Sequence, residues 1–288
     1  MREEIIKIMV EMIRERMGCD VVTKDVPKNN GTVKKAIMII EEGEEEVRIT
    51  PTIYIDDMVA EIEANKWSIA AAVDEVINLH RNNKELGNVK YIISKLSKEI
   101  ILENVQYQLV NKCLNKARLE TVPYKEFLDL AVLYRSIIER TEDGTAGFVI
   151  NNQLCEKYEI SQEELEEAAK RNMAKETFKV TNIAEILLIS IFDETPMYVC
   201  SNESGINGAT IMLDTKYFKE LSEKLGEDLI ILPSSIHEVI AVPKLPEVEL
   251  EALREMVKDI NGTQLAAEEV LGDSVYKYIR EDDKITIA

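Results

Sequence analysis

The chain has 288 residues, and its 35 Lys and Arg against 54 Asp and Glu give a formal net charge of −19. This length predicts one large domain or two modest ones. Hydrophobic residues at 45% and charged residues at 31% are typical of soluble globular proteins. A protein that binds nucleic acid through its phosphates needs an unopposed basic stripe, and no run of Lys and Arg here is long or unopposed. We therefore expect no direct binding of nucleic acid.

The spacing of the cysteines and the length of the apolar runs indicate the cellular compartment of the protein. Cys19, Cys113, Cys155 and Cys200 are too far apart for the disulfide framework of a small domain or for the paired spacing of a zinc site. The N-terminus lacks a secretion signal, and the longest apolar stretch, residues 184–192, is far shorter than the roughly 20 residues that span a bilayer. We expect a cytoplasmic protein with reduced thiols and no membrane contact.

The first part of the chain alternates between helical and strand patterns. Apolar residues recur at helical spacing over residues 3–17, and Gly18 follows as a helix stop. Runs rich in strand formers predict a three-stranded antiparallel meander packed on that helix, over residues 19–26, 33–40 and 46–50. Two further helices are predicted, over residues 53–65 and, after the cap residue Ser68, to about residue 82.

A polar, turn-like stretch over residues 82–87 predicts a domain boundary near Gly87. We therefore expect an N-terminal α+β unit of residues 1–87 and a larger C-terminal α+β domain of residues 88–288.

The second part mixes short helices and strands. Strands are predicted over residues 105–111, 128–138, 229–232 and 239–242, with hairpins formed by 197–201 and 209–213 around Asn207-Gly208 and by 274–280 and 285–287. Helices are predicted over residues 89–98, from the capping box Ser161 and Glu164 to 175, over 217–225 before Gly226, and over 248–260 before Asn261-Gly262. Hairpin-like connections favour an α+β fold of small antiparallel sheets packed with helices, in a two-part chain.

The candidate for catalysis is the segment of residues 233–238, between two predicted buried strands. In an extended segment Ser235 and His237 point to the same side, with the Glu238 carboxylate adjacent. A hydroxyl nucleophile needs a positioned base that is oriented by a third group. No Gly-x-Ser-x-Gly elbow and no third partner is identifiable in the sequence. The other interpretation is a turn whose serines bind backbone amides and whose histidine is structural.

A metal site is not expected. His237-Glu238 resembles the start of the His-Glu-x-x-His zinc motif, but the fifth position is Ala241, and the only other histidine, His80, has no partner at metal-ligand spacing. We predict neither a metal nor a cofactor.

Four segments resemble a known family. They are residues 50–54 (TPTIY), 207–213 (NGATIML), 231–239 (ILPSSIHEV) and 273–278 (DSVYKY). They are similar to a family of clostridial proteins known only as domain of unknown function 5688, and the likeness covers nearly the whole chain. The resemblance implies a bacterial cytoplasmic setting among accessory proteins of gut bacteria, often on mobile elements. It implies no activity.

Three functional hypotheses remain. The first is a non-enzymatic, cytoplasmic bacterial accessory or protein-interaction module, associated with mobile elements and acting on a protein partner. The second is a hydrolase that uses Ser235 and His237, and a serine-directed probe would distinguish it. The third is an acidic DNA mimic, which needs carboxylates regularly spaced on one rigid face. The acidic residues are instead interleaved with Lys and Arg, as on a solvated surface.

Overall fold

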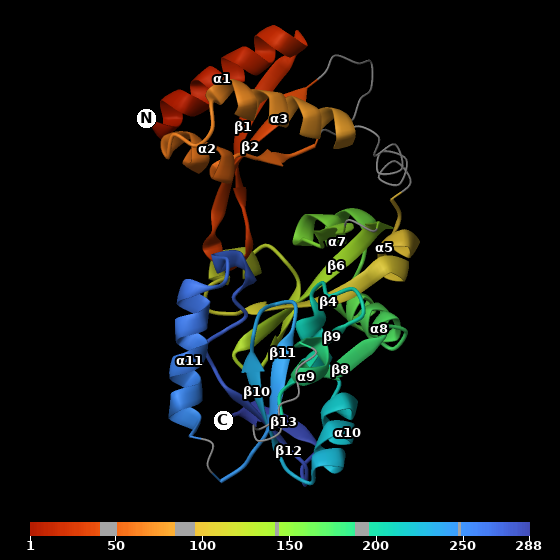
Figure 1. The fold of residues 1–288 in the computed structure, drawn as a ribbon. Coiled ribbons are helices and arrows are strands. Elements are labelled where there is room, and N and C mark those ends of the chain that lie inside the picture. Colours follow the sequence, from red (N-terminus) through yellow and green to blue (C-terminus); the bar gives the residue numbers. More distant parts are fainter. Residues whose placement is uncertain (41–50, 84–95, 142–143, 188–195, 247–248) are drawn as a thin grey trace. The chain divides into compact units, whose positions relative to one another are not determined.

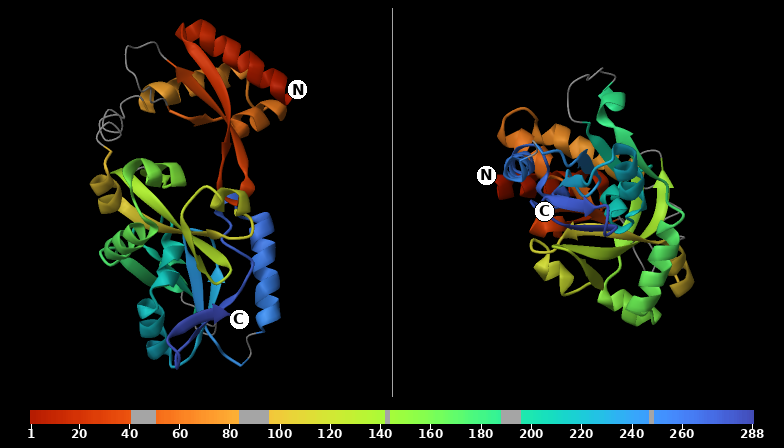
Figure 2. Two further views of the ribbon diagram at one scale, coloured as in Figure 1. Left: turned by 180° about the vertical axis from the view of Figure 1, so that it is seen from behind. Right: turned by 90° about the horizontal axis from the view of Figure 1, so that it is seen from below.

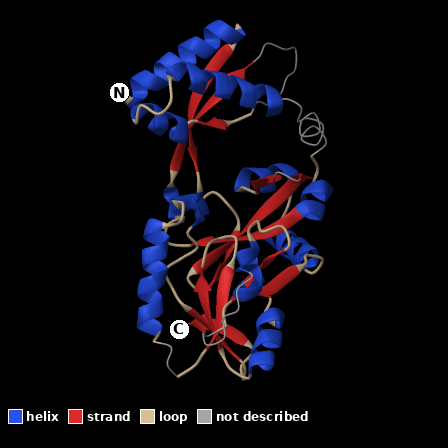
Figure 3. Cartoon of the chain, viewed as in Figure 1, coloured by secondary structure: helices blue, strands red, loops and turns tan. Residues whose placement is uncertain are grey.

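The computed structural model describes residues 1–40, 51–83, 96–141, 144–187, 196–246 and 249–288. These residues form two compact units, one of residues 1–28 and 32–96 and the other of residues 29–31 and 97–288. The boundary predicted near Gly87, the strand predicted over 46–50 and most of the helix predicted over 89–98 lie outside the described residues, so the predicted domain limits stay a prediction. Every described strand pairs antiparallel with its neighbours, and helices pack on the sheets, so the fold is α+β as predicted (Figure 3).

The first unit is a small sheet covered by helices (Figure 1). Its elements are α1 (Arg2–Met17), β1 (Asp20–Pro27), β2 (Val33–Ile40), β3 (Ile53–Tyr54), α2 (Asp56–Glu63) and α3 (Ile69–Asn83). The predicted stop is confirmed, because Gly18 has a φ of 65° and its N–H bonds the carbonyl of Arg14. The predicted cap is confirmed as well, since the Ser68 hydroxyl accepts from the amide of Ala71 at 3.1 Å.

The helix predicted from residue 53 starts later than expected. Ile53 is buried and pairs with Ile37 of β2, and the amide of Ile55 donates to the carbonyl of Lys35. Cross-strand pairing therefore extends the sheet by a short third strand, and α2 begins only at Asp56. The apolar faces of α1, α2 and α3 and the inner faces of the strands form one core cluster in this unit.

The second unit contains two sheets. The first has the order β4-β6-β5, with β7 also paired to β6, and its strands are β4 (Val105–Asn111), β5 (Tyr124–Phe127), β6 (Leu130–Thr141) and β7 (Gly144–Val149). The second has the order β13-β12-β10-β11-β9-β8, and its strands are β8 (Phe178–Asn182), β9 (Tyr198–Asn202), β10 (Leu229–Pro233), β11 (Val239–Pro243), β12 (Tyr276–Ile279) and β13 (Lys284–Ile287). The predicted strands in β4, β6, β10 and β11 and the predicted β12–β13 hairpin are confirmed.

Helices cover both sheets of this unit. They are α5 (Lys98–Asn104), α6 (Lys116–Leu119), α7 (Asn152–Tyr158), α8 (Gln162–Met173), α9 (Ile183–Leu187), α10 (Lys216–Leu225) and α11 (Leu250–Thr263), with 3-10 turns η1 (Asn29–Gly31), η2 (Gly208–Leu213) and η3 (Ala267–Glu269). The α8 helix packs on β4 and α5. On the six-stranded sheet, the ring of Phe218 of α10 packs at a tilt against that of Tyr278, whereas Val257 of α11 packs with Ile230 and Leu232 on the opposite face (Figures 1 and 2).

The hairpin predicted around Asn207-Gly208 is wrong. β9 pairs with β8 and β11, and residues 208–213 form the 3-10 turn η2. Asn207 takes a left-handed conformation with a φ of 54°, and a Cβ on Gly208 would lie only 2.1 Å from the hydroxyl of Ser201. The two residues therefore fold the chain tightly back onto β9, and the five residues of η2 from Gly208 to Met212 become buried. The same dipeptide in an isolated sequence is a hairpin signal.

The predicted end of α11 is also wrong. The helix continues through Asn261-Gly262 to Thr263. The Asn261 amide nitrogen donates to the carbonyl of Gly272 at 3.0 Å and to the carboxylate of Asp273 at 2.8 Å, so this side chain makes tertiary contacts instead of stopping the helix.

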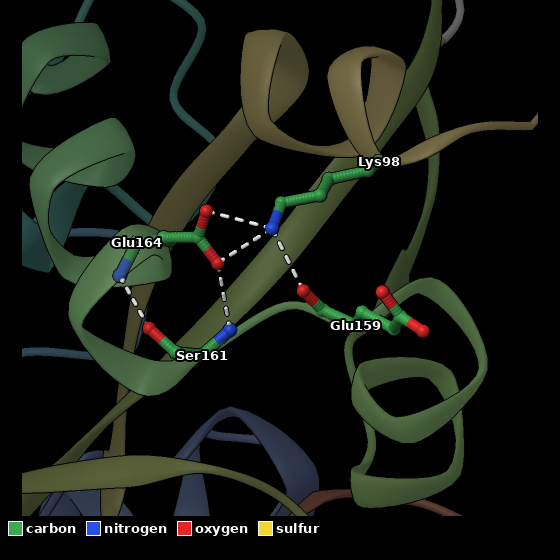
Figure 4. A network of polar contacts seen from close by, with 4 residues as sticks. All are labelled: Lys98, Glu159, Ser161 and Glu164. Carbon is green, nitrogen blue, oxygen red and sulfur yellow. Dashed lines mark hydrogen bonds and ion pairs between the residues drawn. The ribbon is translucent and has the colours of Figure 1, made fainter.

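The capping box at the start of α8 is confirmed and is part of a larger network (Figure 4). The hydroxyl of Ser161 accepts from the amide of Glu164, and the Glu164 carboxylate accepts from the amide of Ser161 at 3.0 Å. The ammonium group of Lys98, in the first turn of α5, donates to the same carboxylate and, at 2.7 Å, to the carbonyl of Glu159. The network thus joins α5, α7 and α8.

Replacing Lys98 with Gln tests this network. The hydrogen bond from Lys98, followed by that from the Ser161 amide, lowers the pKa of Glu164. A carboxylate with a lowered pKa stabilises the fold above its unfolded-state pKa, and that stabilisation is lost as the pH falls through the folded-state value. Urea unfolding should therefore show Lys98→Gln less stable than the parent at pH 7, with the difference shrinking below about pH 4. A difference that stays constant with pH would contradict this role.

Candidate functional site

The candidate catalytic segment, residues 233–238, forms the tight connection between β10 and β11. The amide of Ser235 donates to the carbonyl of Glu238 at 3.0 Å, and the Ser235 hydroxyl accepts from the amide of His237 at 3.0 Å. The hydroxyl of Ser234 donates to the Glu238 carboxylate at 3.2 Å. Ser235 itself is only 7% exposed. These are the bonds of a serine-containing turn.

The His237 ring contacts residues outside the connection between β10 and β11. Its Nδ1 accepts from the backbone amide of Asn207 at 3.2 Å, and its Nε2 lies 3.9 Å from the carboxylate of Glu269. A neutral ring that accepts at Nδ1 carries its hydrogen on Nε2, so neither nitrogen offers a free lone pair to a hydroxyl. Among the described residues no hydrogen bond joins the Ser235 hydroxyl to this ring.

Backbone contacts tie the same connection to its neighbours. The Ser201 hydroxyl donates to the carbonyl of His237 at 2.8 Å, and the amide of Ala209 donates to the carbonyl of Ile236 at 3.3 Å. The amide of Ile236 donates to the carbonyl of Glu269 at 2.8 Å. Residues 233–238 are therefore joined to β9, η2 and η3.

Two thiols of this unit, those of Cys155 and Cys200, are not activated as nucleophiles. Burial raises the pKa of the Cys200 thiol, and burial, together with Glu156, raises that of Cys155. A reactive cysteine needs the opposite shift. Within the part of the chain that the structure describes, no group of three metal-ligating side chains is found and none of the four cysteines is in a disulfide.

A polar cluster that the sequence did not predict lies between the first sheet and α8. The Glu166 carboxylate accepts from the hydroxyl of Tyr134 at 2.9 Å and from the ammonium group of Lys125, which stands 5.0 Å from the centre of the Tyr107 ring. Burial and the Glu166 charge raise the pKa of both tyrosines. Burial alone would raise the pKa of Glu166, but the bonds from Lys125 and Tyr134 outweigh it and lower that pKa. The tyrosines remain protonated donors, and the cluster fixes α8 on the sheet.

A cleft of about 820 Å³ opens in the second unit. Its lining residues come from α5, β4, β6, α8 and the segments before β8 and after β9, and they are Glu103, Asn104, Gln106, Ile137, Ile138, Asn172, Lys175, Glu176, Thr177, Glu203 and Ser204. Several of its polar side chains are held in place. The Asn172 amide donates to three backbone carbonyls, Glu176 accepts from Asn202 at 2.7 Å, and Glu203 pairs with Lys179 at 2.9 Å. No local pattern in the sequence predicts this cleft, because its lining is spread over residues 103 to 204.

The fold and the site define an α+β protein with a preformed polar cleft. The model of the family of unknown function DUF5688 matches residues 2–280, and the chain belongs to that family. Neither a search of curated proteins nor a search of solved structures returned a match. None of the helices that the structure describes has both the length and the apolar character needed to cross a bilayer.

Replacing His237 with Ala should lower the free energy of unfolding by roughly 1 to 3 kcal/mol, because the Asn207 amide loses its acceptor. Replacing Glu269 with Gln should change it by less than about 0.5 kcal/mol, since the contact of its carboxylate with His237 Nε2 is long and partly exposed. Urea denaturation at pH 7 measures both. A His237→Ala protein as stable as the parent would contradict the structural role.

Proposed function

We propose that this protein is a non-enzymatic binding module, and that its cleft takes a basic segment of a partner protein. The observation that carries the proposal is the composition of the cleft, with three carboxylates against one ammonium group among its lining side chains. Such a site attracts cations and repels anions. The apolar side chains of Ile137 and Ile138 offer contact area beside the charges.

The fixed positions of the lining side chains support binding. Asn172 and Glu176 are already held by hydrogen bonds within the protein, so little side-chain entropy is lost when a partner binds. A bacterial cytoplasmic accessory role, on mobile elements, belongs to the same proposal and rests on the sequence resemblance.

The two rival functions stay predictions. The hydrolase needs a base for Ser235, and the bonds at His237 direct no free lone pair to it. The DNA mimic needs a regular array of unpaired carboxylates, and in the described residues many carboxylates pair with lysines or arginines, among them Asp25, Glu126 and Asp228. Covalent labelling of Ser235 by a fluorophosphonate would replace our proposal with the hydrolase.

A fluorescein-labelled Lys/Arg-rich peptide tests the cleft, with an acidic peptide of equal length as its counterpart. Fluorescence anisotropy should show binding of the basic peptide only, weakening as salt is added. Glu103→Lys, in the cleft, should weaken that binding at least about ten-fold.

Glu220→Lys is the matched control, because it makes the same charge change on the exposed face of α10. It should leave the affinity within about two-fold of the parent. Equal effects of the two variants, or no binding of the basic peptide, would overturn the proposal.

A further inference from the structure

Two arginines in the second unit have no anionic partner among the residues that the structure describes. Arg118 lies in α6 and Arg135 in β6, and both side chains are mostly buried. Among the described residues neither guanidinium makes an ion pair, and the Nε of Arg135 is buried without a hydrogen-bond acceptor. Arginine is seldom buried unless it is paired. The chain has 54 Asp and Glu against 35 Lys and Arg, so a shortage of carboxylates does not explain why these two arginines are unpaired.

Strand alternation shows which face of the sheet Arg135 occupies. Residues 131, 133 and 135 of β6 share one face, and on that face Ala131 and Leu133 pack with Leu119 of α6. Tyr134 points to the other face, where it bonds Glu166 of α8. Arg135 therefore faces the same side as α6, which carries Arg118.

Two glutamines of β4 complete the same face. Gln106 is the cross-strand partner of Arg135, and Gln108 is the partner of Leu133. Gln108 is only 5% exposed, and its side-chain oxygen has no hydrogen-bond partner. Since the two ends of a glutamine amide are assigned from their surroundings, a rotated amide presents its N–H₂ group at this place instead.

The neighbouring strand leaves room for the guanidinium. A Cβ on Gly147 of β7 would stand 3.1 Å from the Nε of Arg135 and 2.6 Å from the carbonyl of Ser136. Burial lowers the pKa of both arginines, and the charge of Arg135 lowers that of Arg118 further, so the two cations are close enough to repel each other. An anion between them would remove that repulsion.

We propose that Arg118, Arg135 and Gln108 form a binding site for a small oxyanion, the phosphate or carboxylate group of a ligand. Guanidinium groups bind both classes through paired N–H donors in a fixed fork, and buried amides add further donors. This site is additional to the proposed peptide cleft. It binds anions, whereas the cleft binds a basic peptide. Its test uses small anions only, so its outcome does not depend on peptide binding.

Differential scanning fluorimetry with inorganic phosphate and, separately, with acetate tests the site, against sodium chloride at equal ionic strength. The parent protein should be stabilised in a saturable manner by at least one of the two anions. A response to phosphate alone assigns the phosphate class, and a response to acetate alone assigns the carboxylate class. No saturable response to either anion beyond that to chloride would overturn the proposal.

Three variants locate the binding. Arg118→Gln and Arg135→Gln should each raise the apparent Kd of the responding anion at least about ten-fold. Arg171→Gln, which removes one exposed positive charge on α8, should leave it within about two-fold. In chloride alone, Arg135→Gln should melt no lower than the parent, because a buried unpaired charge is removed.

If Arg135→Gln does not fold, Arg118→Gln on the short α6 helix decides the question alone. An anion response that is equal in Arg118→Gln and in the parent would contradict the site.

Discussion

The second unit depends on a close approach of two backbone segments at Gly208. An added Cβ at this residue would lie 2.5 Å from the carbonyl of His237 and 2.6 Å from the amide of Asn202. Because the side chain is absent, η2 can lie directly on β9, and its other side contacts β4. The turn therefore stands between the two sheets, and its residues from Gly208 to Met212 are buried. Hydrogen bonds from Ser201 and Ala209 then fix the connection of residues 233–238 in the same place.

This constraint explains why polar residues gather in a segment that has the appearance of a catalytic motif. A connection that is packed against η2, β9 and η3 has buried backbone groups that need partners. Ser235 and His237 supply such partners, one to an amide within the turn and one to the amide of Asn207. Their chemistry serves the framework, whereas the surfaces suited to ligands lie elsewhere, in the acidic cleft and beside Arg118 and Arg135.

The sequence predicted the elements whose signals are local. The stops at Gly18 and Gly226, the capping box at Ser161 and the buried strands β10 and β11 depend on a few neighbouring residues, and all are confirmed. The pair Asn207-Gly208 failed because a hairpin and a 3-10 turn use the same residue types, and only the distant segment at His237 decides between them. Short strands such as β5 and β7 were missed because they gain their stability by pairing with β6.

The cleft and the arginine site could not be predicted from the sequence for a similar reason. The cleft draws its lining from four elements and two connecting segments, and no motif relates them. Arg118 and Arg135 belong to different elements, and they come to the same face of the sheet because Leu119 of α6 packs on Ala131 and Leu133 of β6. The one local signal was the alternation in β6, which places an arginine on the face that Ala131 and Leu133 occupy.

The most direct test of this account is the stability of Gly208→Ala compared with Gly262→Ala, measured by urea unfolding. Both variants add one methyl group, but Gly262 lies in α11 with nothing within 4 Å of the added carbon. If the approach at Gly208 holds the second unit together, Gly208→Ala loses about 1 to 3 kcal/mol or more, and Gly262→Ala gains up to about 1 kcal/mol. A Gly208→Ala protein as stable as the parent would contradict the account.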